Sequence, residues 1–202
     1  MFNLNYTYKT IAAPSEAFLS EKNSKFFGFS FPVEDENQIK MQLQKLKDLH
    51  SKANHHCYAF RLGLDNNLFR ANDDGEPSGS AGRPILGQID SFELTHVMVV
   101  VVRYFGGTKL GVSGLISAYK KAAQLALENA EIINKELEDA ISITCDYTEV
   151  NDVMNYFKRI GIDKWEEKYD EVCHLSVKIA KSKSKTLTSW LENGNFTYKV
   201  SK

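Results

Sequence analysis

The sequence predicts an α+β protein made of two domains, residues 1–134 and 135–202. Two observations predict this class. The first part combines β-branched and aromatic runs with amphipathic helical patterns around two glycine-rich loops, whereas the second part alternates short strands and helices in a rhythm of its own. The chain has 202 residues, of which 43% are hydrophobic and 25% charged, so each part can bury a core.

The opening segment, residues 6–32, is predicted to form short strands. Aromatic and β-branched residues alternate there with polar ones, and the polar residues 20–24 supply a turn. From residue 34 to residue 50 the pattern changes, because isoleucine and leucine recur at helical spacing behind an acidic start that favours the helix dipole. This segment is the first predicted helix.

Residues 57–64 form the next predicted strand, and Asp65-Asn66-Asn67 supplies a turn before the strand-like residues 68–71. The two strands therefore predict a hairpin. Residues 72–84 contain three glycines and two prolines, which interrupt regular structure until about Ile85. We expect this segment to be a loop with a function.

The central strand of the first domain is predicted at residues 94–104. Its continuous β-branched run is typical of a strand that is covered on both faces. A glycine-rich turn follows at residues 105–111. Apolar residues then recur at helical spacing up to Ala126, and Ser113 is the expected N-cap of this helix.

The second domain has the predicted element order βαββαβ. Its strands are expected at residues 141–147, 162–170, 172–180 and 196–200, and its helices at residues 149–160 and 185–193. Gly161 and Gly194 follow the two helices, where helix-ending glycines belong. Alternate residues of the first strand are apolar, as in an antiparallel strand with one buried face. This order predicts a ferredoxin-like domain.

Composition and charge narrow the functional classes. The net charge is −1 and both parts are balanced, so any contact with RNA must come from a local patch rather than from a general basic excess. The longest apolar run, residues 97–102, is too short to span a membrane. The amino terminus lacks a secretion signal and the three cysteines have no CxxC spacing, so we expect a cytoplasmic protein without a disulfide scaffold.

The two glycine-rich loops carry most of the candidate chemistry. Glycines let backbone N–H groups converge, and a following helix N-terminus adds unpaired donors. Residues 79–82 and 106–114, with Arg83, Arg103 and Lys109 nearby in sequence, predict a pocket for phosphate or carboxylate groups. The alternative is a pair of purely structural turns, since neither loop matches GxxxxGKS/T or GxGxxG.

The histidine pair and the acidic residues suggest a second hypothesis, an enzyme. Asp74 or Glu76 would act as acid or base together with His55 or His56, with or without a metal. Adjacent histidines on a strand point to opposite faces, however, so they would not bind one ion together. We therefore predict no metal and no cofactor, and expect one histidine to orient a loop by hydrogen bonding.

Three motifs, HHCYAF, NDDGEPSGSAGRP and VVVVRYFGGTKLGVSGLISAY, together resemble the YigZ/IMPACT family. The resemblance covers about residues 17–130. It implies that the first domain is similar to domain 2 of ribosomal protein S5, an α/β sandwich with helices on one face of its sheet. It also implies a ferredoxin-like second domain, a pairing similar to domains IV and V of elongation factor G.

The resemblance further implies a link to translation, because eukaryotic relatives regulate translation initiation. We therefore expect a regulatory or binding protein that contacts RNA, the ribosome or a translation factor; an enzyme and a nucleotide or small-ligand sensor are the alternatives. The expected functional loop comprises Asp73, Asp74, Gly75, Glu76, Pro77, Gly79, Ala81 and Gly82. The expected anion- or partner-binding residues are Arg83, Arg103, Tyr104, Gly106, Gly107, Lys109, Gly111, Ser113 and Gly114, and the resemblance adds Leu110 to the site.

Overall fold

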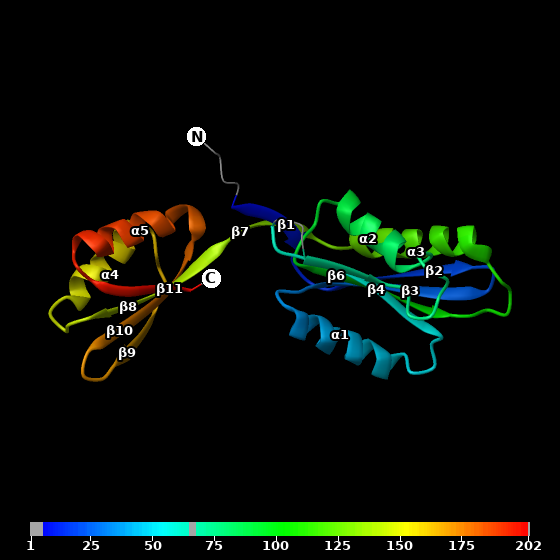
Figure 1. The fold of residues 1–202 in the computed structure, drawn as a ribbon, viewed down its shortest axis with the longest axis horizontal. Helices are drawn as coiled ribbons and strands as arrows, with labels where there is room; N and C mark the ends of the chain where they lie inside the picture. Colours follow the sequence, from blue (N-terminus) through cyan, green and yellow to red (C-terminus); the bar gives the residue numbers. More distant parts are fainter. Residues whose placement is uncertain (1–5, 65–67, 202) are drawn as a thin grey trace. The chain divides into compact units, whose positions relative to one another are not determined.

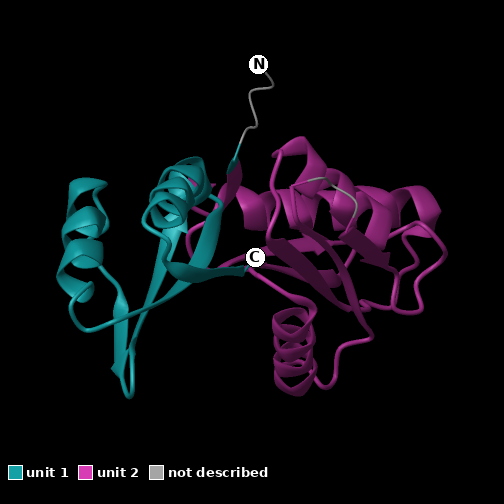
Figure 2. Ribbon diagram, turned by 60° about the vertical axis from the view of Figure 1, so that its left-hand side comes forward, with its two compact units in different colours: residues 1–7, 136–202 teal, residues 8–135 magenta. Residues whose placement is uncertain are grey.

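The computed structural model describes residues 6–64 and 68–201 of the chain. These residues divide into two compact units, residues 8–135 and residues 136–201 together with Tyr6 and Thr7 (Figure 2). Each unit has its own sheet and its own hydrophobic core. No helix within the two described ranges is long and apolar enough to cross a membrane.

The first unit is built on an antiparallel five-stranded sheet in the order β2-β3-β6-β4-β5 (Figure 1). Its strands are β2 (Ser15–Glu21), β3 (Ser24–Pro32), β4 (His55–Leu62), β5 (Leu68–Asn72) and β6 (Val97–Tyr104). β6 lies in the middle and is buried up to Arg103, which confirms the predicted central strand. The predicted hairpin is also confirmed as β4 and β5, although its turn, Asp65-Asn66-Asn67, lies outside the described residues.

Helices cover both faces of this sheet, which corrects the expectation of helices on one face. α1 (Glu36–Leu49) packs on one face, while α2 (Gly82–Ser91) and α3 (Gly111–Glu128) pack on the other (Figure 1). The reason lies in β6, whose side chains alternate between the two faces. Val99 and Val101 belong to the core with α2 and α3, whereas Met98 and Val100 belong to the core with α1.

The starts of the helices differ partly from the prediction. α1 begins at Glu36, two residues after the expected start, because the Asp35 side chain accepts a hydrogen bond from the Gln38 amide and caps the helix there. α2 begins at Gly82 rather than near Ile85. α3 begins at Gly111 with Leu110 as its N-cap, so the expectation that Ser113 is the N-cap was wrong. Ser113 lies inside the first turn of α3.

The second unit confirms the element order βαββαβ. Its elements are β8 (Glu138–Cys145), α4 (Val150–Arg159), β9 (Glu166–Tyr169), β10 (Cys173–Ala180), α5 (Lys181–Asn193) and β11 (Thr197–Ser201). The antiparallel sheet has the order β11-β8-β10-β9. Before it, β7 (Ile132–Glu136) pairs with β1 (Thr7–Ile11) in a separate two-stranded sheet.

The glycines after α4 and α5 end their helices in different ways. Gly161 has a φ of 75°, the left-handed conformation that glycine adopts without strain. Gly194 has an ordinary negative φ, and the left-handed residue at this turn is Asn195 with a φ of 58°. All three cysteines, Cys57, Cys145 and Cys173, are buried and free.

Candidate functional site

The loop between β5 and α2 is held in shape by the Asp73 carboxylate. Its two oxygens accept hydrogen bonds from the backbone amides of Gly79 (2.8 Å), Ala81 (3.0 Å) and Gly82 (2.8 Å). These donors include the first free amides of α2, which otherwise has no side-chain cap. Asp73 therefore caps a helix that begins nine residues further along the chain.

The backbone of the loop requires the left-handed conformation three times. Gly75 and Gly79 have φ values of 86° and 76°, and Asp74, with a φ of 43°, adopts a conformation that residues other than glycine, asparagine and aspartate seldom use. Gly82 has a different reason to be glycine. A Cβ atom at Gly82 would lie 2.5 Å from the backbone nitrogen of Asn72. The loop and the start of α2 thus pack directly against β5.

We expect Asp73→Asn to destabilise the first unit by about 1–2 kcal/mol at neutral pH and to reduce its sensitivity to acid. Burial alone would raise the pKa of Asp73, but the amides of Gly79, Gly82 and Ala81 outweigh burial and hold this pKa below its usual value. The stabilisation is complete above about pH 4, the unfolded-state pKa, and disappears as the pH falls through the lower folded-state pKa. Urea unfolding between neutral and acidic pH would measure it.

The matched control for Asp73→Asn is Asp35→Asn. Asp35 accepts one backbone amide at the start of α1, and asparagine is an equally good N-cap, so this exchange should change stability little. If Asp73→Asn lost stability in acid by the same amount as the unmodified protein, the three amides would not be holding a carboxylate.

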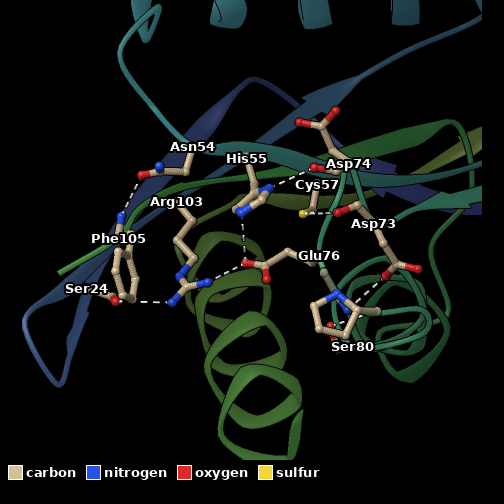
Figure 3. A network of polar contacts seen from close by, with 12 residues as sticks. Ser24, Asn54, His55, Cys57, Asp73, Asp74, Glu76, Ser80, Arg103 and Phe105 are labelled. Carbon is tan, nitrogen blue, oxygen red and sulfur yellow. Dashed lines mark hydrogen bonds and ion pairs between the residues drawn. The ribbon is translucent and has the colours of Figure 1, made fainter. Parts of the chain in front are cut away.

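The next acidic residue, Asp74, fixes the loop to β4. Its carboxylate accepts a hydrogen bond from the His56 amide at 2.6 Å, and its carbonyl oxygen lies 2.8 Å from Nδ1 of His55 (Figure 3). The rings of His55 and His56 lie on opposite faces of the sheet, as adjacent strand residues do. Burial lowers the pKa of His56, with Asp74 opposing that shift. The His55 ring is thus in contact with the loop, and its role in orienting the loop stays a prediction.

Glu76 and Arg103 form a buried ion pair at the centre of the site. Nη1 of Arg103 lies 2.6 Å from Oε1 of Glu76, and the two side chains are only 6% and 4% exposed. The same Glu76 oxygen accepts a hydrogen bond from the Tyr119 hydroxyl at 2.8 Å. Burial raises the pKa of Tyr119, so the hydroxyl stays protonated and can donate. Arg103 is consequently held inside the protein by Glu76, with only a small part of its side chain accessible.

The second glycine-rich loop is attached to the same arginine. Ser24 Oγ accepts hydrogen bonds from Nη2 of Arg103 (3.3 Å) and from the Gly106 amide (3.2 Å). The Phe105 amide donates to the Asn54 side chain at 2.8 Å, and the Phe105 ring lies over the Arg103 guanidinium (Figure 3). Arg103 therefore connects the β5–α2 loop with the loop that follows β6.

A pocket of about 290 Å³ lies where these two loops meet. Its lining is mainly apolar, and Glu76 and Arg103 contribute to it. The residues around it are Glu76, Pro77, Arg103, Phe105, Lys109, Leu110, Gly111, Val112 and Leu115. Phe105 and Val112 are 46% and 55% exposed, so apolar surface at the edge of the pocket is accessible to a partner. We call this pocket and its exposed apolar rim the loop face.

Several predicted residues lie elsewhere or have other roles. Tyr104 contributes to the opposite side of the sheet, where its hydroxyl lies 3.0 Å from Nδ1 of His50. Arg83 and Lys109 are exposed, as surface contacts must be. Gly107 and Gly111 have φ values of 84° and 72°, so each meets a backbone requirement for glycine. Among the described residues, no three histidine, cysteine, aspartate or glutamate side chains cluster as a metal site would require.

Sequence reasoning missed four residues of the site: Ser24, Asn54, Cys57 and Tyr119. Ser24 and Asn54 are far from the loops in the sequence, and only strand pairing brings them close. Tyr119 offered a signal, because a tyrosine on the buried face of a helix needs a partner for its hydroxyl. The Cys57 thiol donates to the Asp73 carbonyl oxygen at 3.0 Å, and burial raises its pKa.

Comparison with known proteins places the chain in a family. The Impact N-terminal domain matches residues 22–127. IMPACT family member YvyE of Bacillus subtilis (strain 168) is 30% identical over 186 residues, which cover 92% of this chain and 86% of that protein. The chain belongs to the IMPACT family.

Two solved structures resemble this IMPACT family protein to different extents. The crystal structure of a hypothetical protein covers 96% of this chain and 97% of its own, with 26% identity and a TM-score of 0.76. The structure of Yih1, described as a two-domain translational regulator, covers 60% of this chain and 47% of its own, with 26% identity and a TM-score of 0.34. The first likeness extends over both units.

Proposed function

We propose that this IMPACT family protein is a translation-linked binding protein that uses the loop face to engage a protein partner, either a translation factor or a ribosomal protein. The link to translation comes from the family resemblance. The choice of partner comes from the site. One observation carries it: two glycine-rich loops, distant in the sequence, form an apolar pocket whose rim exposes Phe105 and Val112.

The make-up of the loop face favours protein over RNA as the partner. Recognition of RNA backbone depends on accessible cations, whereas protein interfaces are rich in exposed aromatic and aliphatic groups at their centre. Arg103 is engaged by Glu76, which leaves Lys109 as the cation of the pocket rim. A protein side chain can fill the apolar pocket while Lys109 contacts an acidic group beside it.

Catalysis has weaker support from the same geometry. A general acid or base must present its proton-carrying atom to a substrate. Oε1 of Glu76 is already bound by Arg103 and Tyr119, and Nδ1 of His55 faces the carbonyl oxygen of Asp74. These contacts explain both residues as parts of the scaffold. A small-ligand sensor stays the second candidate, because the pocket is large enough for a few apolar atoms.

We divide the chain into an IMPACT-type domain, residues 1–134, similar to domain 2 of ribosomal protein S5, and a ferredoxin-like domain, residues 135–202. The two compact units and the sheet order β11-β8-β10-β9 support this division. The pairing would resemble domains IV and V of elongation factor G, and a cytoplasmic location would follow from the role.

Co-sedimentation with purified ribosomes that carry their bound factors tests the proposal. We expect the unmodified protein to sediment with them and Val112→Asp to remain in the supernatant. Val112 lies in the first turn of α3, where an acidic residue suits the helix dipole, so the exchange should remove the apolar contact without harming the fold.

The matched control is Met41→Asp on α1. Met41 is 48% exposed, close to the 55% of Val112, but it lies outside the loop face. It should sediment like the unmodified protein. If the unmodified protein did not associate at any salt concentration, or if both variants lost binding equally, the loop face would not be the binding surface.

A further inference from the structure

Two of the three cysteines lie opposite each other in the sheet of the second unit. β8 and β10 run side by side (Figure 1), Cys145 is the last residue of β8, and Cys173 is the first residue of β10. The register of these antiparallel strands pairs the two cysteines directly. Directly paired residues place their side chains on the same face of a sheet. Both side chains belong to the core of the second unit, so the two thiols are neighbours there.

The spacing of the two strands at this point suits a disulfide bond. In the same strand pairing, the Lys181 amide donates to the Leu137 carbonyl oxygen. Hydrogen-bonded and non-hydrogen-bonded pairs alternate along antiparallel strands, and the cysteine pair is an even number of positions away, so it is also a hydrogen-bonded pair. The Cα atoms of such a pair are about 5.5 Å apart, and disulfides usually span about 4.4–6.8 Å. The backbone spacing therefore permits a bond between the two sulfur atoms.

The pair lies at one end of the sheet, so a small oxidant has a short path to it. Cys145 is 5% exposed, whereas Cys173 and Cys57 are fully buried. Exposed residues 146–148 follow Cys145, and the ends of strands open locally more readily than their centres. The Cys57 thiol is bound to a carbonyl oxygen in the first unit. Cys145 is therefore the thiol that an oxidant meets first.

We propose that Cys145 and Cys173 form a reversible disulfide bond when a peroxide oxidises the protein. The Cys145 thiolate takes one oxygen from hydrogen peroxide and becomes a sulfenic acid, and the hydroxide that leaves takes up the thiol proton. The Cys173 sulfur then attacks the Cys145 sulfur, so that an S–S bond forms and the S–O bond breaks with release of water. Two thiols and one peroxide molecule give one disulfide and two water molecules. A dithiol reductant reverses the reaction by thiol–disulfide exchange.

The surroundings of the pair determine how fast it reacts. Burial, and after it the neighbouring Cys173, raises the pKa of Cys145 to about 11. Burial also raises the pKa of Cys173, and nearby carboxylates act in the same direction. The titratable groups beside the two thiols are Asp146, Glu149, Glu167 and Tyr169. Because the thiolate is the reactive species, oxidation is slow at neutral pH and faster in mildly alkaline solution. The pair therefore responds to prolonged exposure to peroxide rather than to a brief pulse.

The disulfide reinforces the second unit. It closes a loop that contains α4 and β9, and a cross-link of this kind stabilises a fold mainly by restricting the unfolded chain. Trp165 and Trp190 both lie in this unit, so the tryptophan fluorescence of the full chain reports its unfolding. We expect the second unit to unfold at a higher urea concentration after peroxide treatment, and dithiothreitol to remove the difference.

Peptide mapping of the peroxide-treated full chain by mass spectrometry tests the bond itself. We expect the free thiols of the denatured protein to fall from three to one, with Cys145 linked to Cys173 in the same molecule. Cys57→Ala should lose the same two thiols, because Cys57 takes no part in the reaction. Cys145→Ala should gain no resistance to urea from peroxide, and this variant also controls for oxidation of methionine.

Three results on the unmodified protein would overturn the proposal. One is retention of all three thiols in mildly alkaline peroxide. Another is oxidation of Cys145 or Cys173 to sulfinic or sulfonic acid without a link between them. The last is a link that joins two molecules or involves Cys57. None of these results depends on the folding of a variant.

Discussion

Glu76→Leu is expected to destabilise the first unit by about 3–5 kcal/mol, because it leaves the Arg103 charge buried without a partner. Arg103 is 5% exposed, and Glu76 is the only carboxylate among the described residues within ion-pair distance of it. The exchange also removes the acceptor of the Tyr119 hydroxyl. Such a loss is a large fraction of the total stability of an ordinary domain, which is about 5–15 kcal/mol.

Amide hydrogen exchange in β6 is the measurement for this variant. Both tryptophans, Trp165 and Trp190, lie in the second unit, so their fluorescence does not report on the first unit. The variant should exchange the β6 amides much faster than the unmodified protein. The double variant Glu76→Leu/Arg103→Met removes the unpaired charge as well and should recover a substantial part of the loss.

The exposed pair Lys9 and Glu93 provides the contrast. Both side chains are largely accessible to solvent, so Lys9→Met should leave exchange in β6 almost unchanged. If Glu76→Leu exchanged as slowly as Lys9→Met, or if the double variant were less stable than Glu76→Leu alone, the buried pair would not have the structural role assigned to it.

Two glycines of α2 should respond to alanine in opposite directions. At Gly82 the new Cβ atom would lie 2.5 Å from the backbone of β5. Neither α2 nor β5 can move away without breaking the contacts of the loop. We expect Gly82→Ala to cost about 1–3 kcal/mol, as overpacking usually does. Gly87 is exposed, and a Cβ atom there would have no neighbour within 4 Å. Gly87→Ala should stabilise α2 by about 0.5–1 kcal/mol.

The comparison of these two variants is internally controlled, because both exchange the same residues in one ten-residue helix. Chemical unfolding followed by far-ultraviolet circular dichroism would measure the difference. Equal stabilities for Gly82→Ala and Gly87→Ala would show that α2 can move away from β5, and the close packing described for the loop would then be wrong.

Local patterns predicted the elements well because they depend on neighbours in the sequence. The valine run of β6 and the alternating residues of β8 report burial directly, and the structure confirms both. The order of elements in the second unit follows in the same way. The first residues of the helices were harder to predict, since the cap of α2 is supplied by Asp73 rather than by a residue next to the helix.

The candidate site was only partly predictable. The two loops and their glycines were recognised from the sequence. The burial of Arg103 was not, because it depends on the position of Glu76, its ion-pair partner. Charged residues in a glycine-rich segment suggest surface contacts. Pairing across β3, β6 and β4 instead brings Ser24, Arg103 and His55 to the same end of the sheet, and no local pattern reveals that register.

The capping of α2 by Asp73 has a consequence for recognition kinetics. Opening the loop would release three backbone amides at once and fray the helix, so we expect the loop to hold one conformation before any encounter. A preorganised surface loses little conformational entropy when a partner docks. Association at the loop face should therefore proceed as a rigid docking step, with a rate set by collision and orientation rather than by a slow rearrangement of the loop.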